Sequence, residues 1–398
     1  MKFIYNNKTA CLKNYSGVLS AAKSPYVLRT HGALPLTARC SGSSLRALLI
    51  SLTSMSATPC CFYSTTPLNA VQLRAPLKYF IEHAVLILLV IFIIIITSCC
   101  ADKSKEIIDR SGRSVVIKGE IKRVISTAPS NTEIIVDIGQ ADKLVAIDKH
   151  SANVLGIPAD LQGKLPLLDF FYPDAEVIIN LMPDLIIASG HNPSGSGEDP
   201  FRLLREMGVP VVYISMSKSI KDIYLDIKFI AEVLKAGEEG EKLISLMKNQ
   251  VDEIARAALA AQKGTGIENK QTVYFEISAA PDMMTFGKDS FISDMIYVIG
   301  AVNVFGNDNW LVTPGAEAVI ARNPDVILTN VNYIDNPIAE IKNRPGFNHI
   351  SAVQNNRVYQ IDTDSSVRPS ARVVMALRQM QEAVYPGIGT QEPRINAD

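Results

Sequence analysis

One unit of sequence occurs twice in this chain of 398 residues and limits the folds that it can adopt. The first copy spans residues 175–187 (AEVIINLMPDLII) and the second spans residues 316–328 (AEAVIARNPDVIL). In each copy a Glu opens two turns of helix-compatible sequence, a Pro ends them, an Asp follows, and a run of Leu, Ile and Val is typical of a buried strand. The same order of helix, Pro-Asp and strand thus occurs twice. This repetition predicts two similar α/β lobes.

The rest of the chain supports this interpretation by alternating strand-like and helix-like segments. Ser130 and Glu133 fit a capping box at the start of a helix that ends at Gly139. Strands that follow one another through helices predict mostly parallel sheets with right-handed crossovers. We expect strands at 124–128, 144–148, 209–214, 272–277 and 358–362, and further helices at 201–207, 290–299 and 371–384.

The alternation pauses between the two copies of the repeat. Residues 220–235 and 240–262 both have apolar side chains at helical spacing, with no strand between them. Two successive helices indicate a boundary between lobes, and a long bridging helix would limit their relative motion. The predicted order is an N-terminal lobe (107–218), linking helices (219–265), a C-terminal lobe (266–387) and a tail (388–398).

Charge and cysteine usage exclude several classes of function. Residues 1–98 hold nine basic residues and one acidic residue, so the remaining chain has 30 basic and 39 acidic residues. A net negative charge argues against nucleic acid as a partner, since that binding needs clustered Lys and Arg. All six cysteines lie at or before Cys100, which excludes a disulfide framework or thiolate metal site in the lobes.

The N-terminal region resembles an export signal preceded by an extension. Residues 1–76 have no convincing apolar period, and we interpret them either as a targeting segment or as a disordered, non-native extension. Residues 77–98 contain the apolar run 84–96, which has the length of a signal-peptide core. Cys99, preceded by Ile-Thr-Ser, resembles a lipobox cysteine whose acyl chains anchor the tether 99–106 to a membrane. The alternative is a plain transmembrane anchor.

The order of these segments resembles the class III substrate-binding lipoproteins of ABC importers, which carry cobalamin, ferric siderophores or haem. The resemblance covers about residues 107–386. It rests on the lipobox, the strand and helix from 125, and the motifs FYPDAE (171–176), FGKDSF (286–291), NPDVI (323–327), RVY (357–359) and Arg368-Pro369. It implies a class III periplasmic-binding-protein fold, α/β with two lobes joined by a long helix, without enzyme activity or a cofactor.

The resemblance also implies how such a protein meets its transporter. Each lobe of the family carries a surface Glu that docks into arginine pockets of the permease, and these positions match Glu176 and Glu317. A carboxylate at a rigid helix start suits bidentate capture by arginine. The alternative is that each Glu only complements its helix dipole. The partners implied are the permease with its ATPase and a membrane, with the protein itself a monomer.

The ligand is expected between the lobes, where the family places loop aromatics. Aromatic and thioether side chains suit a large, flat chelate. Arg368 could pair with an acidic group of the ligand or form an internal salt bridge. The residues expected to bind the ligand are Phe170, Phe171, Tyr172, Met283, Met284, Phe286, Trp310 and Arg368.

Direct binding of a bare metal ion is not expected. The main body has only His150, His191 and His349, without the spacing of a metal site. His191 lies in the glycine-rich loop 190–200 and could touch a ligand, and Tyr172 could coordinate a haem iron; a solvated His and a packing Tyr are the alternatives.

These observations predict an extracytoplasmic, lipid-anchored receptor that captures a bulky metal chelate for an ABC importer. Trp310 and Arg368-Pro369 most resemble the cobalamin-binding members of this family, and the resemblance implies cobalamin as the ligand, with a ferric siderophore second and haem third. A chelatase-like enzyme is the rival class, because similar lobes also host enzymes. The main body contains no G-x-S-x-G motif, no H-E-x-x-H motif and no cysteine nucleophile, so its sequence gives the enzyme hypothesis no support. A surface adhesin that uses only the lipid anchor is a third possibility.

Overall fold

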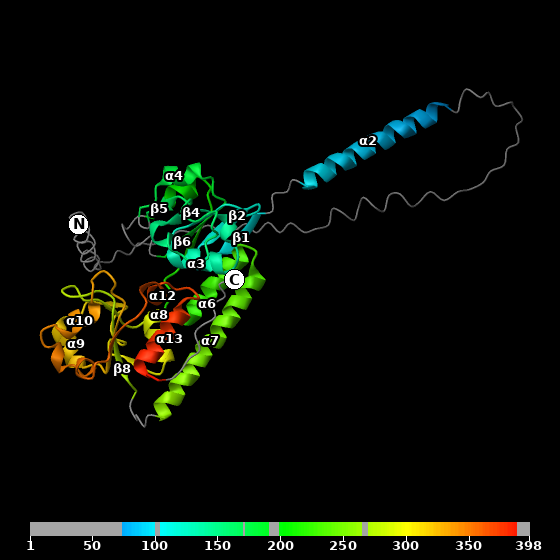
Figure 1. Ribbon diagram of the computed structural model, residues 1–398. Coiled ribbons are helices and arrows are strands. Elements are labelled where there is room, and N and C mark those ends of the chain that lie inside the picture. Colours follow the sequence, from blue (N-terminus) through cyan, green and yellow to red (C-terminus); the bar gives the residue numbers. More distant parts are fainter. Residues whose placement is uncertain (1–73, 100–103, 170–171, 191–198, 265–269, 388–398) are drawn as a thin grey trace, which may run out of the picture. The chain divides into compact units, whose positions relative to one another are not determined.

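The computed structural model describes residues 74–99, 104–169, 172–190, 199–264 and 270–387, without the side chains of 74–78, 92–99 and 264 (Figure 1). The chain divides into two units, residues 1–87 and 88–398, and helix α2 (Arg74–Cys99) includes the boundary. Within the described residues, no helix has both the length and the apolar character needed to cross a bilayer.

The N-terminal lobe is built on a five-stranded parallel sheet. Its strand order is β5-β4-β3-β6-β7, so β3 lies at the centre, with β4 and β5 added on one side of it and β6 and β7 on the other. Helix α3 follows β3 and begins at Pro129, a residue preorganised for the first helical turn. The elements are β3 (Val124–Ser126), α3 (Pro129–Asp137), β4 (Leu144–Asp148), β5 (Leu167–Leu168), α4 (Ala175–Asn180), β6 (Leu185–Ser189), α5 (Arg202–Glu206) and β7 (Val211–Ile214).

The C-terminal lobe repeats this plan with a smaller parallel sheet. Its strand order is β10-β8-β12-β13, and a two-stranded antiparallel ribbon pairs β9 with β11. The elements are β8 (Thr272–Glu276), β9 (Thr285–Phe286), α8 (Phe291–Val298), β10 (Val302–Asn303), β11 (Leu311–Val312), α9 (Ala316–Arg322), β12 (Val326–Thr329), α10 (Pro337–Lys342), α11 (Ser351–Gln354), β13 (Val358–Gln360), α12 (Thr363–Val367) and α13 (Val373–Val384). The predicted two-lobed fold with mostly parallel sheets is confirmed.

Two helices join the lobes, α6 (Ile220–Val233) and α7 (Gly237–Gly264). Helix α13 of the C-terminal lobe packs beside α7 (Figure 1). One continuous cluster of buried apolar side chains contains Val124 and Leu185 of the first sheet, Ile227 of α6, and Val273 and Leu377 of the C-terminal lobe. A shared core of this kind resists independent motion of the lobes, because separating them would expose apolar surface to water.

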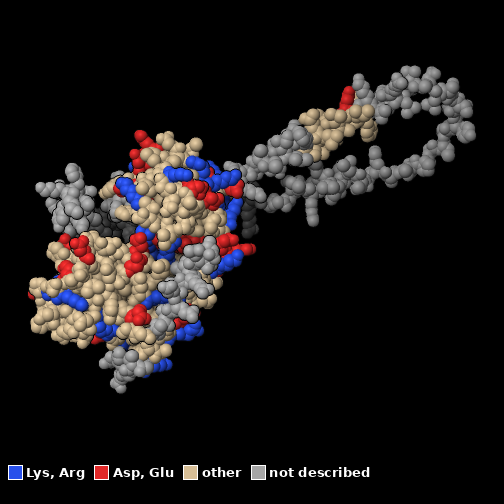
Figure 2. Space-filling view, in the orientation of Figure 1, with Lys and Arg blue, Asp and Glu red and all other residues tan. Residues whose placement is uncertain are grey.

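The opposite face of each sheet has a core of its own. Successive residues of a strand point to opposite faces, so Ile125 and Ile186 pack against α4 and α5, while Tyr274 and Ile327 pack on the outer side of the second sheet. Lys and Arg are interspersed with Asp and Glu on the face shown in Figure 2.

Two local features differ from the sequence-based expectations. Ser104 and Lys105, placed in the tether, begin β1 (Ser104–Ile108), which pairs with β2 (Ser114–Lys118) in an antiparallel hairpin. The predicted capping box is wrong, because α3 starts at Pro129 with Ala128 as its N-cap and no side-chain cap. Glu133 is buried and its carboxylate accepts from Arg368 and Ser370 instead.

Candidate ligand cleft

A cleft of about 360 Å³ lies between the N-terminal and C-terminal lobes, both of which belong to residues 88–398. Its N-terminal wall comes from the carboxyl ends of β3, β6 and β7, the edge at which open α/β sheets bind ligands. Its C-terminal wall comes from the β9 ribbon, the start of α8 and the segment after α12. The described lining residues are Ala128, Pro129, Ser130, Asn131, His150, Ser189, Ile214, Ser215, Met216, Ser217, Phe286, Ser290, Phe291, Ile292, Trp310, Asp364, Val367, Arg368 and Pro369.

An aromatic pair forms part of the C-terminal wall. The rings of Phe286 and Trp310 lie 5.3 Å apart between centroids and are inclined by 52°. The antiparallel pairing of β9 with β11 places them together, and Gly287 N donates to Trp310 O over 3.0 Å. A Cβ at Gly287 would lie 2.1 Å from Asn309 O, so only glycine allows this close approach. The Phe-Gly sequence therefore fixes the position of the tryptophan.

The polar part of the lining is largely uncharged. Hydroxyl and amide groups predominate, among them Ser130, Asn131, Ser189, Ser215 and Ser290. Ser217 Oγ donates to the buried carboxylate of Asp226 over 2.8 Å, and Ser215 Oγ donates to the carbonyl of Arg110 over 2.5 Å. Such groups hydrogen-bond to neutral amides and hydroxyls as readily as to ions.

Arg368 is the only Lys or Arg among the described lining residues, and its guanidinium is engaged within the protein. Its Nη1 donates to Glu133 Oε1 over 2.9 Å and its Nη2 to the carbonyl of His150 over 3.2 Å. Its Nη2 also lies 2.8 Å from Asp364 Oδ1. Glu133 and His150 belong to the N-terminal lobe, so these contacts cross between the lobes.

A second arginine reinforces this junction. Arg372 Nη2 donates to the carbonyl of Leu155 over 3.0 Å and to Asp137 Oδ1 over 3.4 Å. Burial raises the pKa of Asp137 to about 6, against the lowering effect of Arg372. Burial also raises the pKa of Glu133, which the hydrogen bonds from Ser370 and Arg368 oppose. The arginines thus hold these carboxylates at the lobe interface.

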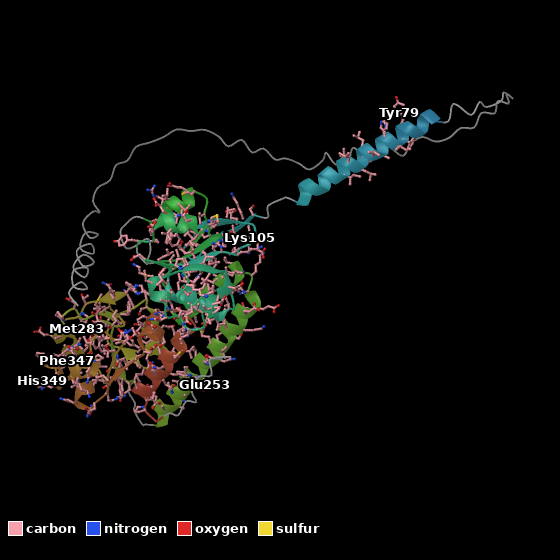
Figure 3. All side chains as sticks on the ribbon, turned by 45° about the horizontal axis from the view of Figure 1, so that its top comes forward. Tyr79, Lys105, Glu253, Met283, Phe347 and His349 are labelled. Carbon is pink, nitrogen blue, oxygen red and sulfur yellow. The ribbon has the colours of Figure 1, made fainter. Side chains whose placement is uncertain are left out.

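Of the described residues that were predicted to bind the ligand, three line the cleft, and Met283, Met284 and Tyr172 are not among its lining residues. Phe286, Trp310 and Arg368 line the cleft. Met283 differs from the expectation, because it is 5% exposed and packs with Phe347 in the outer core of its lobe (Figure 3). Met284, the next residue along the chain, is half-buried, and Tyr172 is 69% exposed, with its backbone N–H donating to Asp169. Phe170, Phe171 and His191 lie outside the described residues.

Several lining residues were missed by the sequence analysis. Ser189 and Ile214 end β6 and β7, and Ala128 and Pro129 follow β3, so each lies at or just past the carboxyl end of a parallel strand. The sequence could have indicated these residues by their position, because the carboxyl ends of parallel strands meet at the edge of the sheet where ligands bind. Among the described residues, no group of three or more His, Cys, Asp or Glu is arranged to hold a metal ion.

The two glutamates of the repeat occupy equivalent and exposed positions. Glu176 lies in the first turn of α4 and Glu317 in the first turn of α9. Both side chains are exposed. Asp174 caps α4 by accepting from the backbone N–H groups of Glu176 and Val177, whereas the N-cap of α9 is Gly315, which has no side chain to form such a cap. Neither glutamate is the N-cap of its helix, and both residues are exposed to solvent.

Two parallel-sheet lobes, a core that continues through the linking helices, and a cleft at the carboxyl ends of strands define a bilobed binding protein. A model of the family described as periplasmic binding protein matches residues 124–365. The ABC transporter substrate-binding lipoprotein YvrC of Bacillus subtilis is 31% identical over 280 residues, which cover 70% of this chain and 85% of that protein. The chain belongs to the periplasmic binding protein family.

Two further comparisons show relatives with different named ligands. The vitamin B12-binding protein of Vibrio campbellii is 27% identical over 267 residues, covering 66% of this chain and 90% of that protein. The crystal structure of a possible iron-binding, periplasmic solute-binding protein from Staphylococcus epidermidis has a TM-score of 0.58 and 30% identity, covering 67% of this chain and 99% of that one. Both names describe binding proteins.

Proposed function

We propose that the protein is the extracytoplasmic substrate-binding component of an ABC importer and captures a bulky metal chelate, with cobalamin favoured. Membership of the family and the likeness to a substrate-binding lipoprotein support the transport role. The cleft binds its ligand without bond chemistry, as a receptor does. The observation that carries the ligand assignment is the cleft's combination of an aromatic pair with an uncharged polar lining.

The aromatic pair suits a large planar ligand. Phe286 and Trp310 place adjoining aromatic rings on one wall of the cleft. Ile214, Met216 and Val367 add further apolar side chains to the lining. Aromatic side chains contribute large contact areas with little loss of conformational entropy. A cleft of about 360 Å³ holds one face of a bulky chelate and leaves the rest exposed for transfer.

The charge balance favours cobalamin among the candidate ligands. Cobalamin carries amide side arms, which the serine hydroxyls and Asn131 can bind. Haem carries two carboxylates and many ferric siderophores are anionic, so either would benefit from a free cation in the cleft. The single cation in the described lining, Arg368, is already paired with Glu133 and Asp364. A siderophore or haem remains the alternative ligand, supported by the iron-binding name of the Staphylococcus relative.

Delivery requires a membrane and a permease. We propose that Cys99 carries the acyl anchor, a few residues before the chain enters β1 at Ser104. Glu176 and Glu317, one exposed carboxylate in each lobe, would bind arginines of the permease. The shared core of the lobes suggests that the ligand enters and leaves with little lobe closure.

Calorimetric titration tests the ligand assignment. The full chain, purified in detergent, is titrated with cyanocobalamin, ferrioxamine and haemin. We expect cyanocobalamin to bind most tightly, with a dissociation constant at or below about 1 μM. Tighter binding of haemin or ferrioxamine would reassign the ligand, and binding of none of the three would refute the receptor role for metal chelates.

A further inference from the structure

Glu133 and Arg368 form an ion pair that joins the two lobes beside the cleft. Glu133 lies in α3 of the N-terminal lobe, 1% exposed, and Arg368 follows α12 in the C-terminal lobe. Their side chains meet over 2.9 Å although 235 residues separate them in sequence. Ser370 also donates to Glu133, so both carboxylate oxygens are occupied.

Arg368 is held between two carboxylates on the wall of the cleft. Glu133 accepts from Nη1, and Asp364 Oδ1 lies 2.8 Å from Nη2. The side chain of Glu133 is 2% exposed, whereas that of Asp364 is 55% exposed. The buried partner fixes the guanidinium firmly, because an uncompensated charge at that depth would be costly.

The pairing changes what the arginine can do for a ligand. A guanidinium that faces a cleft alone would bind a carboxylate in bidentate fashion. Here a ligand carboxylate would have to displace Glu133 or accept the repulsion of Glu133 and Asp364. Neutral hydroxyls or amides meet no such repulsion. The carboxylates therefore leave this wall of the cleft without a net positive charge.

We propose that Glu133 is a specificity-determining residue that acts through Arg368, so that the cleft discriminates against chelates that bear free carboxylates. This inference rests on the proposed function, because it concerns the same cleft. Glu133 is a positioning residue here, since it touches Arg368 rather than the ligand.

A matched pair of ligands isolates the carboxylates. Haemin and haemin dimethyl ester share the ring and the iron but differ in the charge of the side arms. Dissociation constants of both are measured with the full chain in detergent, for the wild type and for Glu133→Gln. Glu133→Gln keeps the shape and one hydrogen bond but removes the negative charge, and we expect it to shift the preference toward free haemin by roughly tenfold.

Two further variants separate selectivity from stability. Asp364→Asn removes the exposed partner of Arg368 without opening the buried interface, and it should shift the ratio in the same direction by a few-fold. Glu241→Gln removes a surface carboxylate that pairs with Lys228 outside the cleft, and it should leave the ratio unchanged. A common loss of affinity for both ligands, with an unchanged ratio in Glu133→Gln and Asp364→Asn, would overturn the inference by assigning the pair a purely structural role.

Failure of the proposed function has a different signature. If the proposed function fails, the wild type does not bind cyanocobalamin. The role of Glu133 in selectivity is tested separately, by the ratio of the dissociation constants of haemin and haemin dimethyl ester. A variant that gains haemin relative to its ester supports the inference whichever chelate the wild type prefers.

Discussion

Asp184 and Asp325, the aspartates of the repeated Pro-Asp, hold equivalent positions in the two lobes. Asp184 Oδ2 accepts from the backbone N–H groups of Lys122 and Arg123, just before β3, at 2.8 and 2.9 Å. Asp325 Oδ2 accepts from the backbone N–H and the hydroxyl of Thr272, the first residue of β8, at 2.8 and 2.7 Å. Each aspartate thus links the repeat to the start of a neighbouring strand in its sheet.

Removing these carboxylates should destabilise both lobes. Asp184→Ala and Asp325→Ala each leave backbone donors at a strand start without their charged acceptor, so we expect each to lower the free energy of unfolding by about 1–3 kcal/mol. Urea denaturation followed by circular dichroism measures the change. Asp335→Ala, at an exposed loop aspartate, is the control and should have little effect. An equally small change in all three variants would contradict the account.

The repeated glutamates should matter for transport and not for ligand binding. Glu176→Ala combined with Glu317→Ala removes one exposed carboxylate from each lobe, so uptake by proteoliposomes containing the permease and ATPase should fall at least tenfold while ligand affinity stays within twofold. The double variant Glu238→Ala and Glu239→Ala removes two exposed glutamates from the first turn of α7 and serves as the control. Parallel losses of uptake and affinity would instead indicate misfolding.

Asp226 should make stability depend on pH. Its carboxylate is 1% exposed and accepts from Arg110 Nε over 2.6 Å, and burial raises its pKa from 3.8 to about 6. Between about pH 4 and 6 the folded state therefore keeps a proton that the unfolded state has lost, and the contribution of Asp226 to stability falls as pH rises through this window.

Asp226→Asn removes this titration. The free-energy difference between wild type and variant should change in the variant's favour by on the order of 1–2 kcal/mol from pH 4 to pH 6.5 and then stay constant. Urea denaturation at a series of pH values measures it. Parallel pH profiles for the two proteins would show that the carboxylate titrates at its ordinary pKa.

Gln381 offers a stabilising substitution. It lies on α13 at 1% exposure, and neither polar atom of its amide has a hydrogen-bond partner among the described residues. Gln381→Met should raise the free energy of unfolding by about 1 kcal/mol, because it removes buried polar atoms that lack partners. Gln379→Met on the same helix removes an amide whose Oε1 accepts from Asp362 N over 2.8 Å, and it should not stabilise. Lower thermal stability of Gln381→Met would contradict this reasoning.

Sequence patterns predicted the elements whose causes are local. Apolar runs, prolines and glycines located most strands and helices, and the repeat located Glu176, Glu317 and both Pro-Asp turns. These signals depend on neighbours a few residues away, which a pattern can contain.

The remaining features depend on contacts between distant residues. Glu133 has the spacing of a capping box, but a tertiary contact with Arg368 determines its role. Met283 and Met284 are adjacent, and only the course of the backbone shows that Met283 enters the core. The hairpin of β1 and β2 is held by Asp109, which accepts from Tyr213 N over 2.9 Å, far along the chain.

The emission of Trp310 tests the central claim most directly, because the chain has one tryptophan and it lines the proposed ligand cleft. Corrin absorption overlaps tryptophan emission, so bound cyanocobalamin should quench Trp310 in a saturable manner, with a midpoint that matches the calorimetric dissociation constant. Trp310→Phe should abolish the signal and weaken binding several-fold through loss of stacking area. Saturable calorimetric binding that leaves Trp310 emission unchanged would place the ligand elsewhere and contradict the account.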